Sequence, residues 1–136
     1  MSVAYKTVQL VDAKRVVEAA VKKAEELKRP VSIAVVGADG YLLAFERMEG
    51  APLASVDLAM KKAWTAKAFN LATKDLAKLA QPGGEFYGVE SDARVVLMMG
   101  GVPLLQDNLA IGAMGVAGAK STAQDVEIAE AGATAF

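Results

Sequence analysis

The chain has 136 residues, 54% of them hydrophobic, and a formal net charge of −1. It contains neither histidine nor cysteine, which excludes a thiol nucleophile, an imidazole base and a zinc site, so we expect no metal site. Charged residues of both signs are interspersed without a basic stripe, so we expect no nucleic-acid partner.

The length is that of a single domain over residues 1–136, large enough to bury a core without disulfides. The N-terminal region lacks the apolar stretch of a signal peptide and any run long enough to span a bilayer. We therefore expect a cytoplasmic protein with no membrane partner. The apolar content is high for so short a chain, so we expect a homo-oligomer in which the apolar residues that the core does not need cover an interface.

The first third of the chain predicts a helix followed by a β-hairpin. Apolar residues recur at helical spacing over residues 12–27, and Asp12 is the expected N-cap. A β-branched run over residues 31–36 and an alternating segment over residues 41–48 predict two strands. The turn residues at 38–40 join them as a hairpin.

The middle of the chain predicts two helices and a loop. Helical patterns cover residues 56–69 and 73–79. The second pattern stops before the sequence Pro-Gly-Gly, and the irregular segment over residues 81–91 that follows is a candidate lid.

The last third predicts three strands, over residues 94–99, 102–105 and 109–117, and a closing helix. The spacing Thr122-x-x-Asp125 resembles a capping box that opens this helix. Asp125 either caps the helix and offsets its dipole or hydrogen-bonds a ligand. Adjacent hairpins imply a mostly antiparallel sheet flanked by helices, the α+β class.

Charged residues end the second strand, in the segment FERMEG, where scaffolds usually present functional groups. Glu46 and Arg47 point to opposite faces because strand side chains alternate. We expect Arg47 to bind a carboxylate through its planar guanidinium, the alternative being a surface or interface salt bridge. Glu46 and Glu49 are candidate acids or bases.

Lys62 and Thr65 share one stripe of the helix over residues 56–69 with apolar neighbours. Such a lysine either points into a pocket as an anion donor or packs its stem and leaves the amine in solvent. Residue statistics favour the second arrangement. Trp64 is expected in the core or in an interface.

Glycines recur in the last hairpin. Gly112, Gly115 and Gly118 interrupt an apolar strand pattern, which makes sense where a ligand or another backbone comes close. Gly100 and Gly101 form a bend that lacks the pattern of a nucleotide-binding loop, and their backbone N–H groups are candidates to face a ligand.

Four segments of the chain are VSIAVVGADGYLLAFERMEGAP, MKKAWTAKAF, GGVPL and IGAMGVAGAKSTAQDVEIAEAG. Together they resemble one known family, the GlcG/HbpS family, once called haem-degrading or DUF336 domains. This family includes the C-terminal domain of PduO-type cobalamin adenosyltransferases. The resemblance implies a profilin-like fold with a five-stranded antiparallel sheet, assembled as a dimer, tetramer or octamer. Residues that stand at matching motif positions are Arg47, Lys62, Thr65, Gly100, Gly101 and Asp125.

The chain departs from this family in two ways. Family members that bind haem or corrinoid are thought to use an axial histidine, and this chain has none. The remaining candidates for an iron ligand are Tyr5, Tyr41, Tyr87, a methionine or a lysine, and a tyrosine ligand needs a partner that lowers its pKa. In addition, Gly37 stands where similar sequences usually have an aspartate, which suggests a retuned site.

Three functional hypotheses follow. The first is a protein that binds a small molecule or a tetrapyrrole, haem or corrinoid. The second is a cofactor-independent isomerase, lyase or hydrolase acting on a small carboxylated or aromatic metabolite. The third is an oligomeric accessory protein without a ligand. Candidate ligand-binding residues are Arg47, Lys62, Thr65, Gly100, Gly101, Gly115 and Tyr87, and candidate catalytic residues are Glu46, Glu49 and Asp125.

Overall fold

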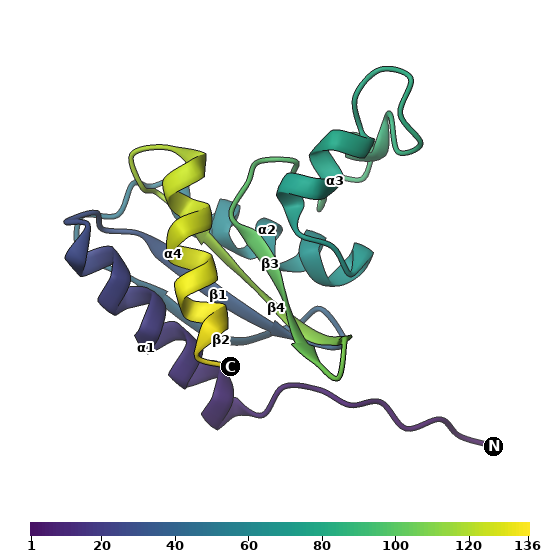
Figure 1. Cartoon of the computed structure of the whole chain (residues 1–136), viewed down its shortest axis with the longest axis horizontal. Coiled ribbons are helices and arrows are strands. Elements are labelled where there is room, and N and C mark those ends of the chain that lie inside the picture. The colour runs from purple at the N-terminus through teal and green to yellow at the C-terminus, as the bar shows by residue number, and fades with distance from the viewer.

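A four-stranded antiparallel sheet separates two layers of helices in the computed structural model, which describes residues 1–136 (Figure 1). The strand order is β2-β1-β4-β3, and the central pair β1 and β4 runs from Ser32 opposite Ala117 to Gly37 opposite Gly112. The prediction of an α+β fold with helices flanking an antiparallel sheet is confirmed. The strands are β1 (Ser32–Gly37), β2 (Leu42–Arg47), β3 (Gly101–Gln106) and β4 (Leu109–Ala117).

Two helices cover one face of the sheet and a third covers the other. Helices α1 (Leu10–Glu26) and α4 (Thr122–Thr134) pack on one face, and α2 (Ser55–Phe69) packs on the opposite face. The short helix α3 (Thr73–Leu79) and the loop after it, which contains a 3₁₀ turn at Val89–Ser91, project away from the sheet (Figure 1). No helix combines the length and the apolar character needed to cross a membrane.

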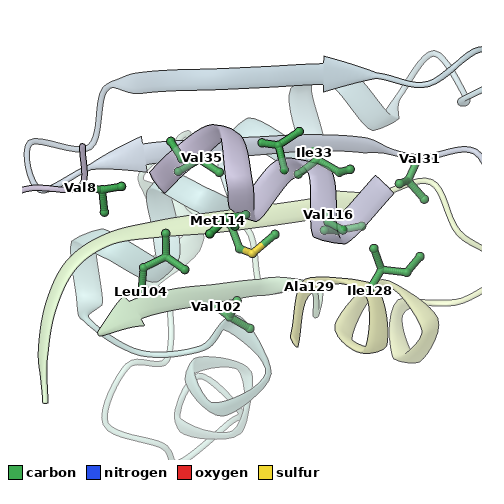
Figure 2. Close-up of a cluster of buried hydrophobic side chains, with 14 of the residues drawn as sticks. Val8, Val31, Ile33, Val35, Val102, Leu104, Met114, Val116, Ile128 and Ala129 are labelled. Carbon is green, nitrogen blue, oxygen red and sulfur yellow. The ribbon is translucent and has the colours of Figure 1, made fainter. Parts of the chain in front are cut away.

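The two faces of the sheet are packed with side chains of different size. Large aliphatic residues, among them Ile33 and Met114, meet α1 and α4 in one cluster (Figure 2). The opposite face meets α2 through small residues, so this helix lies close to the sheet. A Cβ added at Gly115 would lie 2.6 Å from the amide nitrogen of Ala63. Only a glycine leaves room there for the backbone of α2. Of the two expected reasons for this glycine, a ligand or another backbone close by, the structure shows the second.

The prediction of a fifth strand over residues 94–99 is wrong. The hydroxyl of Thr65 donates to the carbonyl of Arg94 at 3.3 Å and accepts from the amide of Val96 at 3.1 Å. The Thr65 side chain therefore hydrogen-bonds the carbonyl and amide groups that would otherwise pair with a neighbouring strand. Val95 and Val96 are both buried, whereas a half-covered edge strand would bury alternate residues.

Two helix starts also differ from the predictions. Asp12 is not the N-cap of α1, which begins at Leu10 after Gln9; Asp12 instead pairs with Arg15 at 2.5 Å within the first turns. The N-cap of α4 is Ser121, whose hydroxyl accepts from the amide of Gln124 at 3.2 Å, and not Thr122. Asp125 is consequently free to make contacts outside the cap.

Candidate functional site

A lysine and an aspartate form an ion pair inside the molecule. Lys62 lies in the middle of α2, and its Nζ donates to Oδ2 of Asp125 at 3.0 Å and to the carbonyl oxygen of Val116 at 2.8 Å. The side chain of Lys62 is 0% exposed and that of Asp125 is 6% exposed. The expectation that the Lys62 amine reaches solvent is therefore wrong.

Asp125, in the first turn of α4, uses its other oxygen to accept from the amide of Ala119 at 2.9 Å. Burial lowers the pKa of Lys62, and the charge of Asp125 opposes that shift. Burial likewise raises the pKa of Asp125, opposed first by the charge of Lys62. No buried side-chain nitrogen or oxygen lacks a hydrogen-bond partner, so the pair is satisfied within the fold and ties α2 to the end of β4 and the start of α4.

A cavity of about 300 Å³, here called the Lys62 pocket, lies beside this pair. It opens between the first turns of α2 and α4, and its polar groups include three hydroxyl side chains. Its lining includes Ser55, Leu58, Lys62, Ser121, Thr122 and Asp125. The buried Ser55 hydroxyl is already used, because its oxygen lies 2.8 Å from that of Ser32.

The glycine bend borders the ion pair. Gly100 has a φ of +127°, and a Cβ there would lie 3.0 Å from Nζ of Lys62. The amide of Gly101 donates to the hydroxyl of Thr73 at 3.0 Å. This N–H, predicted to face a ligand, is therefore occupied by α3.

The fold brings Lys62, Asp125, Gly100, Gly101 and Gly115 together around the contact of α2 with the sheet. Thr65, one turn further along α2, holds the segment that includes Arg94.

Four predicted site residues lie elsewhere, and none of them lines the Lys62 pocket. Arg47 and Glu46 are exposed on β2, and Glu49 is exposed in the loop that follows. Arg47 stands opposite Ser32 on the face covered by α2, whereas Glu46 lies in a hollow on the other face with residues of α1. Tyr87 is 67% exposed on the outlying loop after α3.

A second cavity, which the sequence did not reveal, lies at the turn between β1 and β2. It measures about 410 Å³, and we call it the Trp64 groove. Its walls combine apolar side chains with two cationic groups, and it is built from three separate segments of the chain. The main lining residues are Tyr41, Leu42, Met60, Lys61, Trp64 and Arg94.

Arg94 is held in this groove by two neighbours. Its guanidinium carbon lies 4.1 Å from the centre of the Trp64 ring, a cation–π contact. The same guanidinium donates to both oxygens of Asp92, from Nε at 3.1 Å and from a terminal nitrogen at 2.8 Å. Hydrogen bonds from Arg94 lower the pKa of Asp92 to about 2. The hydrogen bonds to Asp92 raise the pKa of Arg94, and the charge of ionised Tyr41 adds to this shift.

One sequence feature could have indicated this groove: the single tryptophan, Trp64, lies three residues after Lys61, which puts the two on the same side of a helix. Neither Arg94 nor Tyr41 could have been assigned to it, because they are 30 and 23 residues away from Trp64 and only the fold brings them close.

Over residues 8–134 the chain matches the model of a family described as haem degrading protein HbpS-like. It is 46% identical over 114 residues to the corrinoid adenosyltransferase PduO of Citrobacter freundii, and that alignment covers 82% of this chain. The same alignment covers 34% of the relative, so the chain spans about a third of its length.

Two solved structures are similar over nearly the whole chain. Klebsiella pneumoniae protein ORFY, a DUF336 protein, has a TM-score of 0.93 and 31% identity, covering 99% of this chain and 94% of that one. A PduOC:heme complex has a TM-score of 0.89 and 39% identity, covering 95% of this chain and 94% of that one. These similarities span the elements that build both cavities.

Proposed function

Because this chain belongs to the HbpS-like family of haem degrading proteins, we propose that it binds a haem-class tetrapyrrole, and that the Trp64 groove holds it. Membership confirms the resemblance that the sequence indicated. The observation that carries the proposal is the likeness to the PduOC:heme complex, at 39% identity over nearly the full length of both chains.

The chemistry of the Trp64 groove suits such a ligand. Its volume of about 410 Å³ lies within the usual range for small-molecule sites, and most of its lining is apolar. Haem is a flat apolar ring with two carboxylates at one edge. The side chains of Leu42, Met60 and Trp64 offer apolar contact. Lys61 supplies a cation for a haem carboxylate, whereas Arg94 is already paired with Asp92.

The Lys62 pocket is less suited to haem. It is smaller, at about 300 Å³, and its lysine is already bonded to Asp125 and to Val116. Its walls carry hydroxyl groups where the faces of a tetrapyrrole need apolar contact.

Titration of ferric haem into the purified protein tests the proposal. We expect a sharpened Soret band that saturates at one haem per chain. Lys61→Gln should weaken binding about tenfold, because one cation for the haem carboxylates is lost. The matched control is Lys78→Gln, at an exposed lysine outside the groove, which should bind like wild type. Absence of a Soret change in the wild type would overturn haem binding, and equal affinities of the two variants would overturn the assignment to the groove.

A second candidate function is favoured by one observation, the titratable Lys62–Asp125 pair beside a pocket. Perturbed acid and base groups of this kind cluster at catalytic sites, so we propose acid–base chemistry on a small carboxylated metabolite as the alternative. Its test is NMR detection of turnover in a panel of such metabolites. The double variant Lys62→Met, Asp125→Leu removes both charges together and should keep the fold while losing turnover. Undiminished turnover in this variant would exclude the pair as the catalytic group.

A further inference from the structure

Tyr41 and Arg94 line the same groove. The chain has no histidine to bind a haem iron, so Tyr41 is a candidate for that ligand. We propose that the phenolate of Tyr41 is the axial ligand of the haem iron, with the guanidinium of Arg94 balancing its charge. The inference rests on the proposed haem binding and deepens it, because it names the atom that would hold the iron.

The three tyrosines of the chain differ in their surroundings. Tyr41 lines the Trp64 groove together with Arg94. Tyr5 lies in a hollow with Thr7 and Asp39, and no cationic side chain lines that hollow. Tyr87 lies on the outlying loop after α3, and it lines neither the Trp64 groove nor the Lys62 pocket. Only Tyr41 combines an apolar cavity with a neighbouring cation.

Two other donor side chains line the groove and suit ferric iron less well. Met60 offers a soft thioether without charge, whereas ferric iron is a hard ion. Lys61 would have to lose its proton and would then offer a neutral amine to the iron. Tyr41 also releases its phenol proton, to solvent, as the iron–oxygen bond forms, but it then supplies an anionic oxygen, which is an established ligand of ferric haem.

Arg94 lines the same groove as Tyr41, so its guanidinium is one of two cationic groups near an iron held there. Asp92 offsets part of the Arg94 charge, and Lys61 is the second cation of the groove. The phenol itself is accessible to an incoming iron, because Tyr41 is 77% exposed.

Three contacts fix the position of Arg94 before any ligand arrives. Asp92 receives two hydrogen bonds from the guanidinium, and the Trp64 ring lies beneath it at 4.1 Å. The hydroxyl of Thr65 donates to the carbonyl oxygen of Arg94, which fastens this backbone to α2. Thr65, a ligand-binding candidate from the sequence, is therefore a positioning residue that acts through Arg94.

The test compares ferric haem complexes of wild type and Tyr41→Phe by absorption, resonance Raman spectroscopy and redox titration. Wild type should show a phenolate-to-iron charge-transfer band and an iron–phenolate stretching mode. Tyr41→Phe should lose both and have a higher reduction potential, because the anionic ligand that favours ferric iron is gone. Haem should stay bound with about tenfold weaker affinity, since the apolar walls and both cations remain.

Tyr5→Phe and Tyr87→Phe are the matched controls and should keep the wild-type spectra. If haem binds and Tyr41→Phe retains the wild-type spectra and potential, the ligand assignment is overturned while haem binding stands. If wild type does not bind haem, the proposed function is overturned together with the assignment. Tyr41 is largely exposed and its backbone amide bonds to Asp39, so the substitution leaves the folding contacts intact.

Discussion

At the scale of single residues, the ion pair of Lys62 and Asp125 stands out because both charged side chains are buried. Taking both groups out of water carries a large desolvation penalty, which their attraction and their hydrogen bonds to Val116 and Ala119 offset. Removing one partner leaves the other as a buried, uncompensated charge. Removing both leaves an apolar contact between α2 and α4.

We therefore expect Asp125→Asn to lower the free energy of unfolding by about 3–5 kcal/mol. The double variant Lys62→Met, Asp125→Leu should lose much less than the sum of the losses in Lys62→Met and Asp125→Leu, because no unpaired charge remains. Urea denaturation of the wild type, Asp125→Asn, Lys62→Met, Asp125→Leu and the double variant gives the differences. Additive losses would show that the two side chains do not act as a pair.

The surface ion pair of Asp92 and Arg94 predicts how this part of the molecule responds to low pH. The pKa of Asp92 is lowered from 3.8 to about 2 in the folded protein, so its carboxylate stays ionised to lower pH than in the unfolded chain. The stability that this pair contributes is present above pH 4 and is lost as the pH falls towards 2. Since Trp64 is the only tryptophan and lies under Arg94, its fluorescence should change with a midpoint near pH 2.

Asp92→Asn should abolish this transition, because it removes the titrating group and keeps a similar shape. Far-UV circular dichroism over the same range separates the local change from acid unfolding. A transition of equal size in the variant would show that another group is responsible.

At the scale of elements, the sequence predicted the helices and strands well where the pattern is local. The hairpin of β3 and β4, with its turn at Asp107 and Asn108, is an example, because turn chemistry and alternation lie within a few residues. The strand predicted over residues 94–99 is absent because the backbone there bonds to the side chain of Thr65, a helix residue 29 positions away from Arg94. The Lys62–Asp125 pair spans 63 residues, so the sequence could nominate both residues without showing that they bind each other.

The close contact of α2 with β4 gives a prediction at this scale. Gly115→Ala should destabilise the fold by about 2–3 kcal/mol, because the new Cβ would lie 2.6 Å from the amide nitrogen of Ala63 and α2 would have to move. Thermal or urea denaturation measures the loss. A change within about 0.5 kcal/mol would mean that α2 shifts at little cost.

At the scale of the whole molecule, large apolar side chains remain uncovered on a single chain. Leu105 is 50% exposed and Leu109 is 56% exposed, and they lie on the paired ends of β3 and β4. An apolar pair at the end of an edge hairpin is a typical contact between subunits. We propose that this end of the sheet takes part in a homo-oligomer.

Light scattering coupled to size exclusion tests this proposal. We expect a mass that is a multiple of 14.1 kDa, reduced by the double variant Leu105→Lys, Leu109→Lys. Leu53→Lys is the control, because Leu53 is 85% exposed and lies apart from that hairpin. A monomeric wild type would refute the oligomer, and an unchanged mass in the double variant would show that the interface lies on another part of the surface.

The pairing of β1 with β4 has a consequence for how the chain acquires its structure. These central strands join the first strand of the sequence to the last, with Gly37 opposite Gly112, so the middle of the sheet closes a loop of about 74 residues. All six residues of β1 are buried, and until β4 arrives this strand has no partner on one side. Closing so long a loop slows folding, since its entropy is lost before the strands pair. During synthesis, the native sheet therefore forms only after β4 has been made, and earlier intermediates expose a hydrophobic strand to chaperones or to aggregation.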